Sequence, residues 1–111
     1  MLHDAKLRAN GPPSGIERVA AVAAEHADAV DREGRAPLEA IAAMREEGLL
    51  GACVPVSLGG QGASFRTLAR QTQTLAQACA ATAMVYAMHH SQLACVVAHA
   101  LDTPWHRDFA R

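Results

Sequence analysis

The glycine cluster Gly59-Gly60-Gln61-Gly62 is the segment of this sequence whose spacing first suggests a ligand-binding loop. Glycine-rich loops can wrap a phosphate group with backbone N–H donors. No Lys-Ser or Lys-Thr pair follows the cluster, however, and its spacing does not match the dinucleotide-binding motif. The alternative is a tight turn, because glycine adopts positive φ angles without a steric penalty. We therefore predict a turn that uses all three glycines.

Six histidines could supply metal ligands, and two of them, His89 and His90, are adjacent. On a helix their side chains point about 100° apart, so they cannot easily share one ion. No histidine belongs to an HExxH pattern. We predict no metal site, and we expect His89 and His90 to be hydrogen-bonded residues of a core or interface.

Nucleophiles and acid–base pairs are not evident in the sequence. No serine lies in a GxSxG motif or beside a clear base, and Glu46 and Glu47 end a solvated helix surface. Cys53, Cys79 and Cys95 are widely spaced among apolar neighbours, with no CxxC pair. We assign no catalytic residue and expect all three cysteines to be buried, reduced thiols.

Ala83, Ala87 and Ser91 are three small residues spaced four apart, which places them along one side of a helix. A stripe of small side chains leaves a groove. That groove could let another helix approach closely, or it could form one wall of a pocket for an extended apolar ligand. Met84 and Met88 lie one position further on, and their flexible thioethers suit either role.

Helices must position these residues, and the sequence predicts five of them. The first starts at Ser14, which forms a capping box with Glu17, and runs to about residue 32. The second starts at Pro37 and ends at Gly48, which we expect to adopt a left-handed conformation. An ordered glycine-rich connector follows, and Ser64 caps the third helix. The fourth covers residues 80–101, and a fifth starts at 104 and meets the chain end.

Apolar spacing predicts which face of each helix is buried. The inner faces of the first three helices are expected to contain, in chain order, Val19, Val22, Ala23, His26 and Val30, then Leu38, Ile41, Ala42 and Met44, then Phe65, Leu68, Ala69, Thr72, Leu75, Ala76 and Cys79. The fourth helix is apolar on nearly every face. We therefore expect it to be central and packed on several sides.

Composition supports a single all-α domain. The chain has 111 residues, of which 50% are hydrophobic but only 4% aromatic, a balance that favours helices over sheet. We place a flexible leader at 1–13 and the domain at 14–111. The net charge of -1 predicts neither nucleic acid nor an anionic lipid surface as a partner. Polar residues interrupt the uncharged stretch 71–101, and the start lacks a secretory signal, so we expect no membrane insertion and a cytoplasmic location.

Three short motifs together resemble the acyl-CoA dehydrogenase family. They are Gly48-Leu49-Leu50-Gly51, Val54-Pro55 and Leu58-Gly59-Gly60-Gln61-Gly62-Ala63-Ser64. They match the family's Gly-Leu turn, Val-Pro pair and Gly-Gly-x-Gly-x-Ser stretch in order and spacing. The resemblance extends through Met88-His89-His90 and covers about residues 14–101. It implies the family's N-terminal up-and-down bundle of about four to five helices, truncated at the start of its last helix.

The resemblance also implies a function. Family members use FAD to dehydrogenate an acyl-CoA thioester, with a glutamate base that would lie beyond residue 111. The Thr-Glu-Pro-type flavin segment is missing, so we assign no cofactor-binding residue. The family's central helix lines the acyl-chain cavity, which assigns Ala83, Ala87 and Ser91 to the substrate pocket. A one-residue slip would substitute Met84, Met88 and Gln92.

Several alternatives remain open from the sequence. After His99 the family commonly shows a glycine and a Gln-Lys pair, whereas this chain has Ala100-Leu101-Asp102-Thr103-Pro104-Trp105. Relatives with the same fold include flavin-dependent monooxygenases, acyl-CoA oxidases and nitroalkane oxidases. The other alternative is a stand-alone helical interaction module. The resemblance implies that the domain is inactive alone and that a full-length form is a homo-oligomer.

Overall fold

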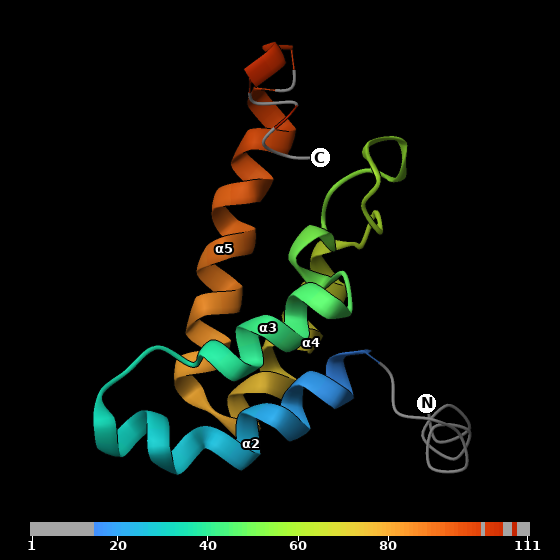
Figure 1. Ribbon diagram of the computed structural model, residues 1–111. Helices are drawn as coiled ribbons and strands as arrows, with labels where there is room; N and C mark the ends of the chain where they lie inside the picture. The colour runs from blue at the N-terminus through green and yellow to red at the C-terminus, as the bar shows by residue number, and fades with distance from the viewer. Residues whose placement is uncertain (1–14, 101, 106–107, 109–111) are drawn as a thin grey trace, which may run out of the picture.

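The computed structural model describes residues 15–100, 102–105 and 108, and these residues form helices and turns without a strand. The four long helices are α2 (Gly15–Glu33), α3 (Leu38–Glu46), α4 (Phe65–Ala78) and α5 (Ala80–His99). Two short 3₁₀ helices, η1 (Leu49–Gly51) and η2 (Val56–Leu58), lie in the connector between α3 and α4. The prediction of an all-α bundle is confirmed (Figure 1).

α4 is the helix that ties the bundle together, because it packs against both α2 and α5. α3 packs mainly on α2, and α5 follows α4 after the single extended residue Cys79. Figure 1 shows α5 rising beyond the other helices. The expectation that this helix is covered on several sides is wrong, since Met84 and Met88 are 61% and 64% exposed. α5 therefore carries more apolar side chains than the described part of the chain buries.

The core joins all four helices and η1 around side chains that are almost fully buried. Its buried members are Val19, Ala23, Ala40, Ala43, Met44, Leu49, Leu75, Cys79, Ala83 and Tyr86. A smaller cluster of Val54 and Leu93 holds the connector against the upper half of α5. Burial of this apolar surface is the main favourable contribution to folding.

Two of the predicted inner faces need correction. α3 buries Ala40, Ala43 and Met44, while Leu38 and Ala42 are exposed. The alanine-rich sequence offers two overlapping apolar faces, and contact with α2 selects the one with smaller side chains. On α4, Leu68 and Leu75 are buried as predicted, but Phe65 is 85% exposed.

Several helix ends confirm their sequence signals. The Ser64 hydroxyl accepts a hydrogen bond from the Thr67 N–H at 3.1 Å, so it caps α4. Gly48 ends α3 with a φ of 70°, in the left-handed region where glycine has no Cβ penalty.

The leader 1–13, Ser14 of the capping box and most of the last predicted helix lie outside the described residues. None of the helices in the described part of the chain has the length and apolar character needed to cross a bilayer.

The glycine cluster forms a turn, but its three glycines serve two purposes. Gly59 and Gly62 have φ angles of 89° and 63°, as predicted. Gly60 does not have a positive φ; instead, a Cβ at this position would overlap the carbonyl oxygen and Cβ of Val54. The close approach brings the Gly62 N–H to the Val54 carbonyl oxygen at 2.8 Å.

Substituting Gly60→Ala should destabilise the domain, because the Val54 backbone is part of the connector and cannot move aside like a flexible side chain. We expect a loss of about 1–3 kcal/mol in the free energy of unfolding, measured by urea denaturation. Gly51→Ala is the matched control, since an added Cβ there meets no atom within 4 Å. Equal stability of the two variants would contradict the close contact.

Candidate functional site

An apolar groove between α4 and α5 is the candidate site. It encloses about 310 Å³ and is open to solvent on one side. Its lining residues are Phe65, Leu68, Ala69 and Thr72 from α4, and Ala87, His90, Ser91 and Ala94 from α5. Two of the three residues assigned to the substrate pocket from the sequence, Ala87 and Ser91, therefore lie in it.

Ala83 does not line the groove. It is only 6% exposed and belongs to the main core, where its small side chain lets the helices approach closely. The stripe of small residues thus packs against other helices at its start and borders a groove further along. Ala94 extends the stripe by one turn and was missed, although its three-residue spacing from Ser91 is visible in the sequence.

The residues that a one-residue slip would place in the pocket lie on a different surface from the groove. Met88 and Gln92 line a shallow hollow of about 480 Å³ together with His89, Ser91 and Cys95. Ser91 borders both hollows, so it marks the edge between them. The α4 wall of the groove was also missed, because Phe65, Leu68 and Thr72 were expected to form a buried helix face.

The polar atoms of the groove are largely occupied within the protein. The Ser91 hydroxyl donates to the Ala87 carbonyl oxygen at 2.8 Å, and the Thr72 hydroxyl donates to the Leu68 carbonyl oxygen at 2.9 Å. The surface that remains consists mainly of methyl groups and hydrocarbon edges. Such a lining can bind an apolar chain, but it offers no activated nucleophile or base.

Two histidines of α5 hold the connector in place. His89 Nε2 lies 2.6 Å from the Leu50 carbonyl oxygen, and His90 Nε2 lies 2.9 Å from the Leu49 carbonyl oxygen. Consecutive imidazoles thus bind consecutive carbonyls of η1. The prediction of hydrogen-bonded histidines is confirmed, with the addition that His90 also forms part of the groove wall.

The His90 ring is neutral and has a defined tautomer. It is 4% exposed, and burial lowers its pKa, partly opposed by the bond to the Leu49 backbone. Nε2 therefore carries the proton that it donates to Leu49, and Nδ1 faces the Cys53 sulfur at 3.4 Å as an acceptor. Burial raises the pKa of Cys53, so the thiol keeps its proton and can donate it to Nδ1.

Tyr86 joins α4 to α5 below the groove. It is fully buried, and its hydroxyl donates to Gln71 Oε1 at 2.6 Å. Burial raises the pKa of this hydroxyl, so Tyr86 stays neutral and acts as a donor. Its ring also packs edge-on against His90, with the centroids 4.5 Å apart. Tyr86 thus belongs to the core and contacts His90, which lines the groove.

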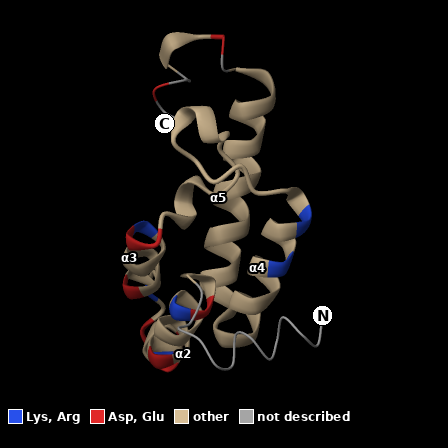
Figure 2. Ribbon diagram, turned by 90° about the vertical axis from the view of Figure 1, so that its right-hand side faces the viewer, with Lys and Arg blue, Asp and Glu red and all other residues tan. Residues whose placement is uncertain are grey.

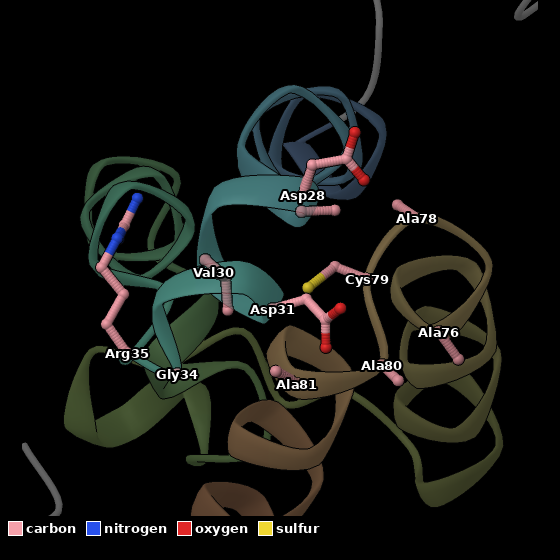
Figure 3. A pocket seen from close by; sticks show the side chains of 11 residues that line it. Asp28, Val30, Asp31, Gly34, Arg35, Ala76, Ala78, Cys79, Ala80 and Ala81 are labelled. Atoms are coloured by element: carbon pink, nitrogen blue, oxygen red, sulfur yellow. The ribbon is translucent and has the colours of Figure 1, made fainter.

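A second, larger hollow lies at the opposite end of α4, where α2 ends and α5 begins (Figure 3). It encloses about 510 Å³, and Asp28, Asp31 and Cys79 are among its lining residues. Among the residues that the structure describes, no three His, Cys, Asp or Glu side chains gather as metal ligands would.

The three cysteines are free thiols, but only one matches the expected burial. Cys79 is buried, Cys53 is intermediate and Cys95 is exposed. The expectation of three buried thiols is thus wrong for Cys53, which is partly exposed, and for Cys95, which borders the shallow hollow on α5.

The groove and the buried Thr82 offer few free polar groups for a flavin. The polar side chains of the groove, Thr72, His90 and Ser91, already bond to backbone carbonyls. Thr82 Oγ1 has no hydrogen-bond partner among the described residues, but it is fully buried and does not line the groove. Neither set supplies the exposed donors that a flavin ring or its phosphates would need.

The neutral state of His90 predicts a loss of stability in acid. Because its folded-state pKa lies below the unfolded value of about 6.5, its contribution is complete above that pH and decreases as the pH falls through the folded pKa. The loss is about 1.4 kcal/mol for each unit of lowering. Urea denaturation at a series of pH values would measure it.

His90→Gln should flatten this pH dependence, whereas His99→Gln should leave it unchanged, because His99 is an exposed histidine of the same helix. An unaltered slope in the His90 variant would show that another group causes the acid loss.

Comparison with known proteins agrees with this architecture. The family model for the acyl-CoA dehydrogenase N-terminal domain matches residues 16–102, which include the groove and all four long helices except Gly15, the first residue of α2. The comparisons with curated proteins and with solved structures gave no match. Because the family match covers most of the sequence, the chain belongs to the acyl-CoA dehydrogenase family, of which it carries the N-terminal domain.

Proposed function

We propose that this domain forms one wall of the acyl-chain pocket in a flavin-dependent oxidoreductase that dehydrogenates an acyl-CoA thioester between its α and β carbons. The observation that carries the proposal is the apolar groove between α4 and α5, which contains Ala87 and Ser91. The described residues supply binding surface and no catalytic group, so the domain is inactive alone. FAD would be held by other segments of the enzyme.

The shape and chemistry of the groove support an extended hydrocarbon as its occupant. From Ala87 to Ala94 the lining follows α5 for about 10 Å, at 1.5 Å per residue. Small side chains on this wall leave depth, while Leu68 and Phe65 supply apolar contact on the other. An apolar chain in the groove would gain about 25 cal/mol for each Å² removed from water.

The free thiols support a reducing compartment such as the cytoplasm, because disulfides form mainly in oxidising compartments. Acyl-CoA is the small-molecule partner of this proposal. Ala83 is retained only as a packing residue, since its burial leaves no surface for a ligand.

A second candidate function is a stand-alone interaction module. It is favoured by the exposed side chains of Phe65, Met84 and Met88, since large exposed apolar groups often mark a protein contact. The two candidates differ in what the groove binds. A module would bind a protein and not a thioester.

The distinguishing experiment measures flavin content and thioester-dependent flavin bleaching. It compares the 111-residue chain with a polypeptide extended through any downstream coding sequence. The enzyme proposal expects bound flavin and bleaching by acyl-CoA only in the longer protein. A colourless longer protein would favour the interaction module.

Filling the groove should weaken the binding of an acyl chain. We expect Ala94→Phe to raise the Kd of dodecanoyl-CoA for the domain at least about tenfold, or about 1.4 kcal/mol, in a fluorescence titration. Ala98→Phe is the matched control: both alanines are exposed on α5, but only Ala94 lines the groove. Equal Kd values, or no binding by the folded wild-type domain, would contradict the proposal.

A further inference from the structure

Charge is divided between the two halves of this domain. Residues 15–47 contain eight acidic residues and four arginines, whereas 48–100 contain Arg66 and Arg70 and no other Asp, Glu, Lys or Arg. Figure 2 shows the result: the acidic colour is confined to α2, α3 and the last described turn, and α4 carries basic colour alone. Eight acidic residues minus four arginines leave residues 15–47 with a net charge of -4, whereas residues 48–100 have a net charge of +2.

An exposed group of side chains lies at the start of α4, within residues 48–100. We call it the arginine patch, and it consists of Phe65, Arg66 and Arg70. All three are exposed, and Phe65 is the most exposed large hydrophobic residue described, at 85%. Neither arginine forms an ion pair within the described residues, unlike Arg18 and Arg35. Aromatic and arginine side chains together are the composition typical of protein-binding hot spots.

The larger hollow, which we call the aspartate hollow, lies where the end of α2 in the acidic half meets the end of α4 and the start of α5 (Figure 3). Much of its surface is methyl groups, from Ala27, Ala76, Ala78, Ala80 and Ala81. Asp28 and Asp31 line it and form no ion pair within the described residues. Arg35 at its rim is already held by Glu33 and Glu39. The hollow thus combines an apolar surface with two uncompensated carboxylates.

We propose that the aspartate hollow of one copy receives the arginine patch of a second copy. The Phe65 ring would pack on the alanine methyls while Arg66 and Arg70 pair with Asp28 and Asp31. The spacing agrees: the arginines are four residues apart on α4, about 6 Å, and the aspartates three apart on α2, about 4.5 Å. Long arginine side chains can cover the difference.

The two surfaces are different, so the contact is heterologous and runs head to tail. Within one copy no ion pair joins them, which leaves both available to a neighbour. The second copy is the occupant favoured here because this chain itself carries both complementary surfaces. Neither arginine and neither aspartate lines the acyl groove, whereas Phe65 belongs both to the arginine patch and to the groove lining, so the contact borders the groove at Phe65.

Sedimentation equilibrium of two double variants tests this contact. One variant carries Arg66→Gln and Arg70→Gln, and the other carries Asp28→Lys and Asp31→Lys. Wild type should self-associate, with an association constant that falls at least about tenfold between about 0.05 and 0.5 M NaCl. Each variant alone should be monomeric. Their equimolar mixture should form a one-to-one pair, because each variant retains one native surface.

Formation of the mixed pair also shows that both variants are folded, since each must present an intact surface. Met84→Ser with Met88→Ser is the control and should associate like wild type, because these residues lie on neither surface. A monomeric wild type at about 1 mM protein and low salt would overturn the proposal. So would variants that associate as wild type does, or a mixture of folded variants that stays monomeric.

Discussion

Two imidazole–carbonyl hydrogen bonds fix the arrangement on which the rest of this domain depends. His89 and His90 bind the carbonyl oxygens of Leu50 and Leu49, two groups of a short 3₁₀ turn. The Leu49 carbonyl oxygen also accepts from the Ala52 N–H at 3.2 Å, so the two histidines add bonds from α5 to those that the connector forms by itself. The connector leads directly into α4. Because α5 holds the connector through these two bonds, the bonds also constrain how α4 lies beside α5. The groove between these helices is a consequence of that constraint.

The groove and the core draw on the same property of α5, its small side chains. Where α5 meets the other helices at Ala83, a small residue permits close packing, and Tyr86 fills the remaining space while donating to Gln71. One and two turns later, Ala87 and Ser91 face a gap that α4 does not fill. A single sequence stripe therefore passes from core packing to the lining of the groove. The neutral His90 lies at this transition, because it bonds to the Leu49 carbonyl of the connector and also lines the groove.

The sequence predicted what depends on local chemistry. The Ser64 cap, the left-handed Gly48 and the hydrogen-bonded histidines were all visible in it, because each follows from one residue type and its near neighbours. Helix faces were less predictable, since an alanine-rich helix such as α3 has no single dominant stripe. Tertiary contacts decided that Leu38 and Phe65 are exposed and that Gly60 is needed for close approach rather than for its φ. The α4 wall of the groove could not be inferred for the same reason, because it depends on how two helices meet.

The central claim is that the α4–α5 groove receives an apolar acyl chain, and intermolecular NOEs test it most directly. The domain would be labelled at alanine and methionine methyl groups and mixed with dodecanoyl-CoA. The account predicts NOEs from the acyl methylenes to the methyl groups of Ala87 and Ala94, which line the groove. NOEs confined to Met84 and Met88, on the exposed flank of α5, would contradict it and place the ligand on the other surface.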